Sequence, residues 1–384
     1  MTRTDTETTC EVVKIVAVDK HPNADRLEIA HFAFADGTIP DYQVVVGKGD
    51  FVVGQLAVYI SDDMMVPIDL DEFAFLKTRL DYKGTTHYRI RAAKIRGQIS
   101  TGLIIPHNKL WGNLGSDVSG VLGVIKYVNP LDSQDINSQK SVSKRGSSWF
   151  GRLLTRLGKY FYKPVSVPEY GVTSLRKVPD LFKDGEKVIL TEKIHGCNIR
   201  FGKIGNRIYV GSHRTEKSDS RPWFLRKVFP RRQNAGFYGK DVWSTWFSRI
   251  FNSKDRLAEL PSNIIFYGEL FGPGIQPWTY GLRNTQVMVY DAYDIKNKRW
   301  LDHIELSVQL PWFIQLVPTI GTNNDTIFNR DSIKTLAESN TQVKDYFDVD
   351  PKHKCNDMEG IVVRSLDWSR AGKLVSDKYL TSEH

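Results

Sequence analysis

The hydrophobic pattern of the first third of the chain predicts short β-strands. Apolar, β-branched runs are separated by Gly, Asp and Pro turns, as in EVVKIVAV (11–18), YQVVVGKG (42–49) and GQLAVYIS (54–61). A further run, VLGVIKYVNP, ends at residue 130. About five short strands in this length of chain predict a small barrel or sandwich, which we place in a first domain at residues 1–128.

Residues 129–168 have the pattern of a linker followed by one helix. Ser, Asn, Gln and Asp dominate 129–147, a composition typical of linkers. In WFGRLLTRLGKYFYK (149–163) the apolar positions follow helical spacing, and the basic residues fall mostly on the other face. Such a basic amphipathic helix can lie on a membrane surface or bind a partner, although packing on the neighbouring domain is the commoner arrangement.

From residue 169 onward the pattern is mixed. Strand-like apolar runs occur in KVILTEK, RIYVGS, NIIFYGELFG, QVMVYDAYDI and GIVVRS, and helical patterns occur at 243–260 and 304–347. The sequence therefore predicts the α+β class, with a small β domain followed by a larger mixed domain at residues 169–384.

Composition narrows the class of protein. The chain has no run of 18 apolar residues, so no membrane span is expected, and its first residues lack the apolar region of a secretory signal. The cysteines, Cys10, Cys197 and Cys355, lie far apart and indicate neither a disulfide framework nor a CxxC metal site. We expect a cytoplasmic protein in a reducing compartment.

The distribution of charge adds a candidate partner. Lys and Arg number 53 against 44 Asp and Glu, a net charge of +9, and the stretches 136–168 and 220–240 contain basic and aromatic residues but no acidic ones. Phosphates attract the cations and unstacked bases stack on the rings, although a solvated face is an equally common explanation. The candidate nucleic-acid-binding residues of the second stretch are Arg221, Arg226, Lys227, Arg231 and Arg232.

Two motifs in the first domain go beyond composition. KHPNADRL (20–27) and KIRGQISTGL (94–103) resemble the tRNA-binding OB-fold module that is appended to some tRNA synthetases. The resemblance implies an N-terminal OB-fold β-barrel that binds nucleic acid, since the open face and loops of such a barrel can follow a backbone. The alternative is an OB barrel that has kept its fold and lost its RNA contact.

The segment VILTEKIHGCN (188–198) places Lys193 at the end of a predicted strand, before a glycine turn. Lysine has an ordinary pKa near 10.4, so it must lose a proton to attack phosphorus, which a nearby metal ion or cationic cluster can promote. Further polar residues follow in or beside apolar strands; they are Arg214, Glu269, Tyr293, Asp294, Glu359 and Lys373. Glutamates in apolar runs are costly to bury unless they are paired or liganded, which favours a shared site.

This ordered set resembles the covalent nucleotidyltransferases, the superfamily of polynucleotide ligases and capping enzymes. EKIHG, FYGELFG and EGIVVR are similar to the RNA ligase 2 branch, and the OB module in front resembles the Deinococcus-type RNA ligase family. The resemblance implies an ATP-grasp-like adenylyltransferase domain. It also implies an ATP-dependent RNA ligase that joins 3′-OH and 5′-phosphate ends through lysyl-AMP and an adenylated 5′ end, in repair of nicks or breaks.

The same resemblance implies roles for individual residues. Lys193 is the nucleophile, Glu269 holds the ribose, and Tyr293 stacks on adenine. The implied catalytic set is Lys193, His195, Glu269, Glu359 and Lys373, and the implied ATP contacts are Glu192, Gly196, Asn198, Arg214, Tyr293 and Asp294. Glu269 and Glu359 are the implied ligands of Mg²⁺ or Mn²⁺. The implied partners are ATP and RNA or a nicked duplex, with no membrane, and we expect a monomer.

One departure and two alternatives stay open. Val375 stands where the family usually carries a second lysine, and the next lysine is Lys378, so the number of lysines that serve the phosphates is undecided. A capping guanylyltransferase or a DNA ligase is the first alternative, but those enzymes commonly place the OB domain last and Asp where His195 stands. The second is a non-catalytic RNA-binding protein, against which the intact lysine and glutamates argue.

Overall fold

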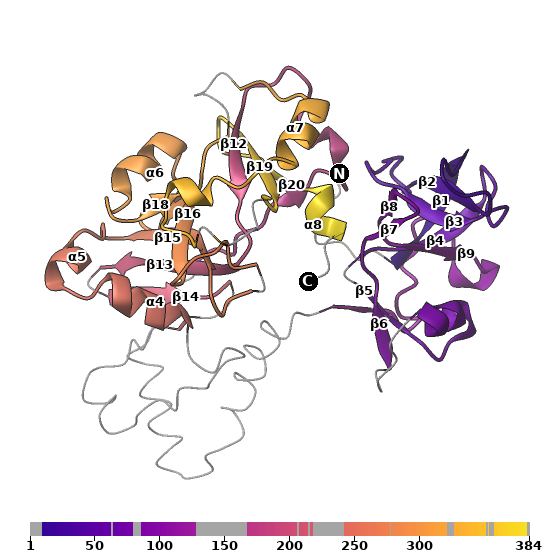
Figure 1. Cartoon of the computed structure of the whole chain (residues 1–384), viewed down its shortest axis with the longest axis horizontal. Coiled ribbons are helices and arrows are strands. Elements are labelled where there is room, and N and C mark those ends of the chain that lie inside the picture. Colours follow the sequence, from indigo (N-terminus) through magenta and orange to yellow (C-terminus); the bar gives the residue numbers. More distant parts are fainter. Residues whose placement is uncertain are drawn as a thin grey trace, which may run out of the picture.

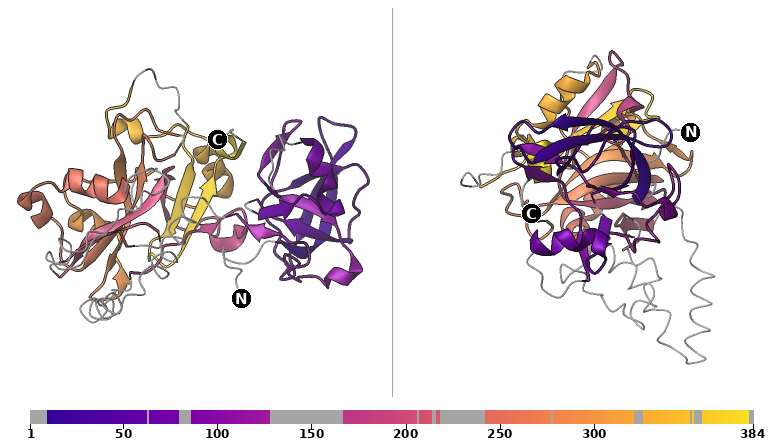
Figure 2. Two further views of the ribbon diagram at one scale, coloured as in Figure 1. Left: turned by 90° about the horizontal axis from the view of Figure 1, so that it is seen from below. Right: turned by 90° about the vertical axis from the view of Figure 1, so that its right-hand side faces the viewer.

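The fold is taken from a computed structural model of the chain. It describes residues 10–62, 64–79, 86–127, 167–205, 207–213, 216–217, 242–276, 278–320, 326–350, 352 and 357–381. The predicted linker and helix of 129–163 lie outside these residues. The described residues form an N-terminal module (10–127) and a C-terminal module (167–381), which stand side by side in Figure 1 and in the left view of Figure 2; in the right view of Figure 2 the N-terminal module lies in front of the other.

The N-terminal module is built on an antiparallel sheet with the strand order β3-β2-β1-β4-β9. Its strands are β1 (Cys10–Lys20), β2 (Leu27–Ala33), β3 (Val44–Gly47), β4 (Leu56–Ile60) and β9 (Leu103–Pro106). A second sheet joins β10 (Ile125–Lys126), β5 (Met64–Pro67) and β6 (His87–Arg89), and β7 (Ala93–Ile95) forms a hairpin with β8 (Gln98–Ser100). Two 3₁₀ helices complete the module, η1 (Asp71–Arg79) and η2 (Lys109–Trp111).

The central strand β1 is buried on both of its faces. Val12 packs in an apolar cluster with Phe73, and the next residue, Val13, packs in a second cluster with Phe32 and Tyr59. Successive side chains of a strand point to opposite faces, so the sheet is covered on both sides. This two-sided burial is the core of the β domain that the strand pattern predicts.

The C-terminal module contains two largely antiparallel sheets. The first has the order β11-β20-β19-β12, with β11 (Thr173–Ser174), β20 (Ala371–Val375), β19 (Gly360–Ser365) and β12 (Val188–Lys193). The second has the order β14-β13-β15-β16-β17, with β14 (Arg207–Gly211), β13 (Cys197–Ile204), β15 (Ile264–Phe271), β16 (Gln286–Asp294) and β17 (Arg299–Trp300). A short strand, β18 (Gln315–Leu316), pairs in parallel with β16.

Helices cover the sheets, and all of the described helices of this module except the last lie where helical patterns are predicted. They are α4 (Val242–Ile250), α5 (Lys254–Ala258), α6 (His303–Gln309), α7 (Arg330–Ala337) and α8 (Asp377–Thr381), with short 3₁₀ turns η3 (Pro179–Leu181) and η4 (Val343–Asp345). No helix in the described part of the chain is long and apolar enough to cross a membrane.

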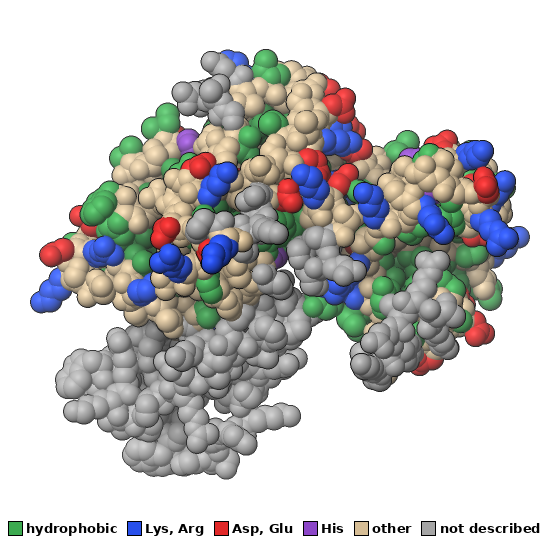
Figure 3. All heavy atoms as spheres, in the orientation of Figure 1, with side chains coloured by type: hydrophobic (Ala, Val, Ile, Leu, Met, Phe, Trp, Pro, Cys, Tyr) green, Lys and Arg blue, Asp and Glu red, His purple; other side chains and the backbone are tan. Residues whose placement is uncertain are grey.

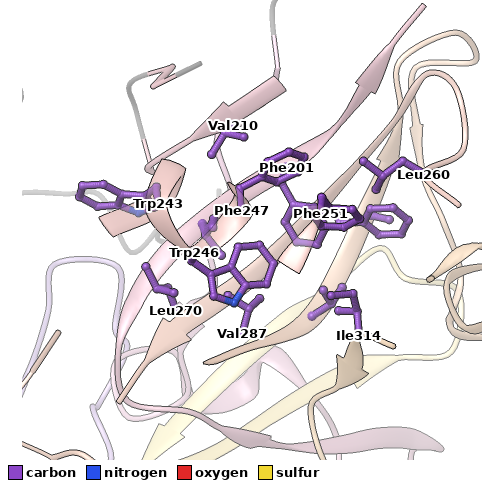
Figure 4. Packing of buried hydrophobic residues seen from close by; sticks show 14 of the residues in the cluster. Phe201, Val210, Trp243, Trp246, Phe247, Phe251, Leu260, Leu270, Val287 and Ile314 are labelled. Carbon is purple, nitrogen blue, oxygen red and sulfur yellow. The ribbon is translucent and has the colours of Figure 1, made fainter. Parts of the chain in front are cut away.

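One face of the second sheet carries the largest apolar core. Trp246 and Phe247 of α4 pack on Phe201 of β13, together with Phe251 beyond the helix (Figure 4). The rings of Phe247 and Phe251 stack with centroids 4.5 Å apart. Because α4 covers this face, the opposite face of the sheet is the one that can carry polar chemistry.

The described residues include contacts between the two modules. In the N-terminal module the backbone N–H of Asp41 donates to the carbonyl of Arg176 at 2.8 Å, and the Asp41 carboxylate pairs with Lys334 of α7 at 2.8 Å. Strand β7 lies against α8, which is on the side of the C-terminal module that faces the N-terminal module (Figure 1). The hairpin of the second N-terminal motif is thus next to the end of the chain.

Candidate active site

Lys193 lies where the chain passes from one sheet to the other. It is the last residue of β12, paired in register with Gly360 of β19, and the chain enters β13 of the second sheet four residues later, at Cys197. Gly196 makes this crossing possible. A Cβ atom there would lie 2.3 Å from the Leu270 carbonyl oxygen and 3.0 Å from Cγ of Glu269. The close approach that a glycine was expected to allow is therefore made to the neighbouring strand, beside Glu269.

Two glutamates flank the Lys193 ammonium group. Glu359, directly before β19, has its Oε1 atom 2.6 Å from Nζ of Lys193, and its side chain is only 8 % exposed. Its second oxygen, Oε2, is buried and accepts no hydrogen bond from the described residues. Glu269 approaches from β15 of the other sheet, closely enough for its charge to act on both Lys193 and Glu359. The structure thus brings together three of the predicted catalytic residues from three strands.

These contacts change the protonation of the cluster. Burial by itself would lower the pKa of Lys193, but the carboxylates of Glu359 and Glu269 outweigh burial and raise that pKa above its ordinary value. Burial raises the pKa of Glu269 to about 8, against the opposing effect of Lys193. With these neighbours alone, Lys193 therefore holds its proton.

Lys373 joins the same cluster from β20. It is paired in register with Val362 of β19, and its positive charge lowers the pKa of Glu359, against the larger effect of burial. Val375 lies opposite Gly360, so an apolar side chain occupies the rung next to Lys193. Lys378 does not fill the gap. Its ammonium group pairs with Asp357 at 3.1 Å and is half exposed, so of the described lysines only Lys193 and Lys373 are seen to act on Glu359.

His195 is fixed by aromatic residues that the sequence analysis did not select. Its backbone N–H donates to the hydroxyl of Tyr280 at 2.7 Å, and its Nδ1 atom lies 2.9 Å from the hydroxyl of Tyr379. Nδ1 is also 3.8 Å from Oε2 of Glu359. Trp278 packs beside the imidazole with ring centroids 5.9 Å apart. The imidazole therefore belongs to the Lys193 cluster, as predicted.

Tyr290 is an aromatic residue beside Glu269. Asn198, opposite Glu269 on β13, donates its side-chain N–H to the Tyr290 hydroxyl, and the Glu269 charge raises the pKa of that hydroxyl in addition to the larger effect of burial. Tyr293 lies elsewhere: it pairs with Ile265, four rungs along β15 from Glu269, or roughly 13 Å. Tyr293, the residue predicted to stack on adenine, thus lies away from Glu269, whereas Tyr290 lies beside it.

A bulge in β16 explains the shift. The register between β15 and β16 slips at this point, because Tyr267 pairs with Asp291 and Gly268 pairs with Val289. A bulge places one extra residue opposite its partner strand, so the side-chain alternation is interrupted. Tyr290 and Asp291 are consecutive residues, and because of the bulge both side chains lie on the face of the sheet away from α4.

Asp291 ties the two sheets together. Its carboxylate pairs with Arg364 of β19 at 2.9 Å, and both side chains are almost completely buried, at 1 % and 4 % exposure. The indole N–H of Trp368 donates to the same carboxylate at 3.1 Å. This ion pair fixes the distance between the sheet that carries Lys193 and the sheet that carries Glu269, and the sequence analysis missed it.

Two predicted ATP contacts face away from the cluster. The Glu192 carboxylate lies on the other face of β12, where it accepts hydrogen bonds from the Thr341 hydroxyl at 2.5 Å and the Gln342 backbone at 2.9 Å. Asp294 closes the turn after β16, since its carboxylate accepts from Lys296 and Asn297. Both carboxylates thus make local structural contacts, and ATP contacts from either residue stay predictions.

Six further residues that were predicted to bind ATP or nucleic acid are not described by the structure. Arg214 and the basic residues Arg221, Arg226, Lys227, Arg231 and Arg232 lie outside the described part of the chain. Within that part, no group of three or more His, Cys, Asp or Glu is arranged to hold a metal ion.

Comparison with known proteins now adds to the geometry. The sequence model described as RNA ligase matches residues 186–379, just over half of the chain, and one described as an OB-fold domain matches residues 9–107. The β subunit of phenylalanine–tRNA ligase from Syntrophus aciditrophicus (strain SB) is 29 % identical over 111 residues. That match covers 29 % of this chain and 11 % of the relative, so the chain spans about a ninth of that protein.

Solved structures extend the similarity to the whole fold. An apo variant of an RNA ligase from Naegleria gruberi is 19 % identical and aligns over 98 % of both chains with a TM-score of 0.69. A second variant of RNA ligase from Naegleria gruberi, solved with ATP and Mn, is 20 % identical, covers 97 % of this chain and 98 % of its own, and has the same TM-score. At this identity the likeness establishes a shared fold. Together with the family match, it shows that the chain belongs to the RNA ligase family, is a ligase, and carries an OB-fold domain at its N-terminus.

Proposed function

We propose that the protein is an ATP-dependent RNA ligase that joins 3′-OH and 5′-phosphate ends through a lysyl-AMP on Lys193. The observation that carries this proposal is the convergence of Lys193, Glu269, Glu359 and Lys373 at the junction of two sheets. The RNA ligases of Naegleria gruberi have been solved with ATP and Mn and with pyrophosphate, which supports the choice of nucleotide and by-product.

The first step forms a bond between Nζ of Lys193 and the α-phosphorus of ATP, while the bond from that phosphorus to the bridging oxygen breaks and pyrophosphate leaves. Nζ must lose a proton, and Oε1 of Glu359 at 2.6 Å is the nearest acceptor. Lys373 offers positive charge to the α-phosphate. The AMP then passes to an RNA 5′-phosphate, and attack by a 3′-hydroxyl releases AMP, so catalysis depends on positioning and charge neutralisation.

The donor set fits a hard divalent cation, Mg²⁺ or Mn²⁺. Glu359 and Glu269 would hold it, because carboxylate oxygens are the ligands that such ions prefer. Oε2 of Glu359 is buried without a hydrogen bond from the described residues, and burial raises the pKa of both carboxyl groups, which a cation would relieve. When bound, the ion supplies charge neutralisation at the phosphate oxygens.

The nucleoside would lie on the second sheet. We assign the adenine contact to the ring of Tyr290 and the ribose contact to Glu269, since both lie on the side of that sheet away from α4. Asn198 steadies the ring through the Tyr290 hydroxyl, and its side-chain oxygen is buried without a partner in the described structure.

The N-terminal module would guide the RNA. His21 is buried and its Nε2 lies 3.1 Å from the carbonyl of Ile95, while Asn23 donates to the carbonyl of Arg96 at 3.1 Å. The two predicted RNA motifs thus form one structure, the β7–β8 hairpin and the loop that supports it. Lys94 and Arg96 are exposed on it, next to α8. Basic side chains also gather along the outer edge of the module (Figure 3), as expected of a phosphate-binding surface.

The wider assignment follows from the same resemblance. We infer that the protein belongs to the Deinococcus-type branch, with an OB module at 1–128, a connecting segment at 129–168 and an ATP-grasp-like adenylyltransferase domain at 169–384. The protein would act as a monomer on nicked or broken RNA in a reducing compartment.

Self-labelling tests the proposed function. The protein is incubated with α-labelled ATP, or in parallel α-labelled GTP, plus Mg²⁺ or Mn²⁺, and run on a denaturing gel. We expect covalent label from ATP in the natural protein, none in Lys193→Ala, and full label in the matched control Lys183→Ala, because Lys183 is an exposed lysine of the same module. Label from GTP alone would make the protein a capping enzyme. Absence of label would leave a non-catalytic RNA-binding protein.

A further inference from the structure

Three aromatic residues from two distant segments form one stack beside His195. Trp278 and Tyr280 come from the loop between β15 and β16, and Tyr379 comes from α8. The ring of Trp278 lies at 15° to that of Tyr280, with centroids 6.1 Å apart, and at 11° to that of Tyr379, with centroids 5.2 Å apart. Trp278 is therefore the middle of the stack, which we call the aromatic bracket.

The two hydroxyl groups of the bracket hold His195 at two points. Tyr280 accepts the backbone N–H of His195 at 2.7 Å, and the Tyr379 hydroxyl lies 2.9 Å from Nδ1 of the imidazole. The imidazole is 12 % exposed, and Nδ1 is also 3.8 Å from Oε2 of Glu359. The bracket thus fixes both the backbone position of His195 and the direction in which its ring presents Nδ1 to the carboxylate that pairs with Lys193.

The backbone of Tyr280 is strained in the position that makes this contact. Its φ angle is +55°, in the left-handed region that bulky residues rarely adopt, and its side chain is 3 % exposed. Backbone strain of this kind persists where the surrounding structure enforces it, and it concentrates at functional sites. The strain is therefore consistent with a loop shaped to bring the Tyr280 hydroxyl to His195.

Helix α8 holds Tyr379 firmly although it lies near the end of the chain. The Glu338 carboxylate accepts from the backbone N–H of Asp377 at 2.5 Å, and the Ser376 hydroxyl accepts from the backbone N–H of Tyr379 at 3.1 Å. Arg176 pairs with the Asp377 side chain. The contacts of Asp377 tie the start of the short helix to the rest of the module, two residues before Tyr379.

We propose that Tyr379 is a positioning residue for nucleotidyl transfer, which acts by orienting the His195 imidazole toward Glu359 and Lys193. The inference rests on the proposed function of the Lys193 cluster. It adds a residue from the last helix, beyond the motifs that the sequence analysis used. Because the hydroxyl bonds to Nδ1, its effect passes through His195 and not through the nucleotide.

Tyr379→Phe tests this role, because it keeps the stacked ring and removes only the hydroxyl. We expect the rate of lysyl-AMP formation at saturating ATP to fall roughly tenfold, with little change in the KM for ATP, as for the loss of one hydrogen bond. The loss should vanish in a His195→Ala background and return with His195→Asn, whose amide places a polar atom near the position of Nδ1. Tyr346→Phe is the matched control, since Tyr346 is 41 % exposed. Equal losses in all three backgrounds would overturn the proposal.

A spectroscopic measurement tests the same contact without any need for activity. In ¹⁵N spectra of the histidine side chains, His195→Ala identifies the His195 signals by their disappearance. Tyr379→Phe should shift the Nδ1 signal of His195 and leave the other histidines unchanged; an unmoved signal would refute the bracket. Failure of the natural protein to label with ATP would instead refute the proposed function, so the two failures are distinguishable.

Discussion

The two faces of the sheet formed by β13, β15 and β16 differ in what they contribute. The face under α4 is apolar and aromatic, with Phe201, Trp246 and Phe251 in one packed cluster (Figure 4). The face toward the first sheet carries Glu269 and Asp291, carboxylates whose burial raises the pKa of each to about 8. Burial of the apolar face stabilises the fold. Burial of the carboxylates on the other face costs part of that free energy, but it places them at the candidate site.

The largest effect on stability is expected from the apolar face. Trp246→Ala removes a fully buried indole between α4 and β13, and it should reduce the free energy of unfolding by about 3–5 kcal/mol. Denaturant unfolding measures this loss, and ATP labelling should survive at temperatures where the variant remains folded. Trp312→Ala is the control, because that indole is 78 % exposed. A folded variant that cannot label would mean that the two faces are not separable.

The next largest effect on stability is expected from the ion pair between Asp291 and Arg364, which joins the two sheets. Asp291→Asn leaves the buried Arg364 guanidinium without its counter-ion, and we expect a loss of about 3 kcal/mol or more. Arg364→Met should cost less, because Asp291 can take up a proton at neutral pH whereas Arg364, with a pKa that burial lowers to about 9, stays charged.

The double variant sharpens this prediction. Combining Asp291→Asn with Arg364→Met removes both charges, so it should recover part of the stability that Asp291→Asn loses. Strictly additive losses in denaturant unfolding would contradict the pairing.

The smallest effect on stability, and a large one on function, is expected from Glu269→Gln. Burial raises the Glu269 pKa from 4.5 to about 8, so the folded protein binds more protons than the unfolded chain between these values. Its contribution to stability therefore falls as pH rises from 4.5 to 8. Without nucleotide or metal, the melting temperature of the variant should decline less steeply across this range than that of the natural protein, while labelling is lost.

The control for this comparison is Glu259→Gln, which changes an exposed glutamate at the end of α5. It should reproduce both the pH profile and the labelling of the natural protein. Identical melting profiles for Glu269→Gln and the natural protein would show that the Glu269 carboxyl titrates normally.

Much of the site could be predicted from the sequence. Apolar runs predict buried strands, and a charged residue inside such a run is costly to bury unless it is paired or liganded. Lys193, Glu269, Glu359 and Lys373 were found in this way, and the structure brings them together. The orientation of Glu192 was not predicted: its carboxylate faces Thr341 and Gln342, because adjacent residues of a strand face opposite sides.

Other features have no local signal in the sequence. The bracket of Trp278, Tyr280 and Tyr379 joins segments that lie about a hundred residues apart in the sequence. In the sequence, each of these residues has the pattern of an ordinary core aromatic. The pair of Asp291 and Arg364 likewise depends on how the two sheets are packed. The place of Tyr290 beside Glu269 was not predicted either, because the bulge in β16 interrupts the side-chain alternation that the strand pattern assumes.

That bulge has a consequence for evolution by insertion and deletion. A strand without it would carry Tyr290 and Asp291 on opposite faces, so loss of a single residue between 287 and 291 would send one of them into the packed core under α4. The segment should therefore have a fixed length in functional relatives, even where its side chains vary. Sequence alignments of such relatives are best anchored on the Tyr290–Asp291 dipeptide, with gaps allowed only in the turns on either side of β16.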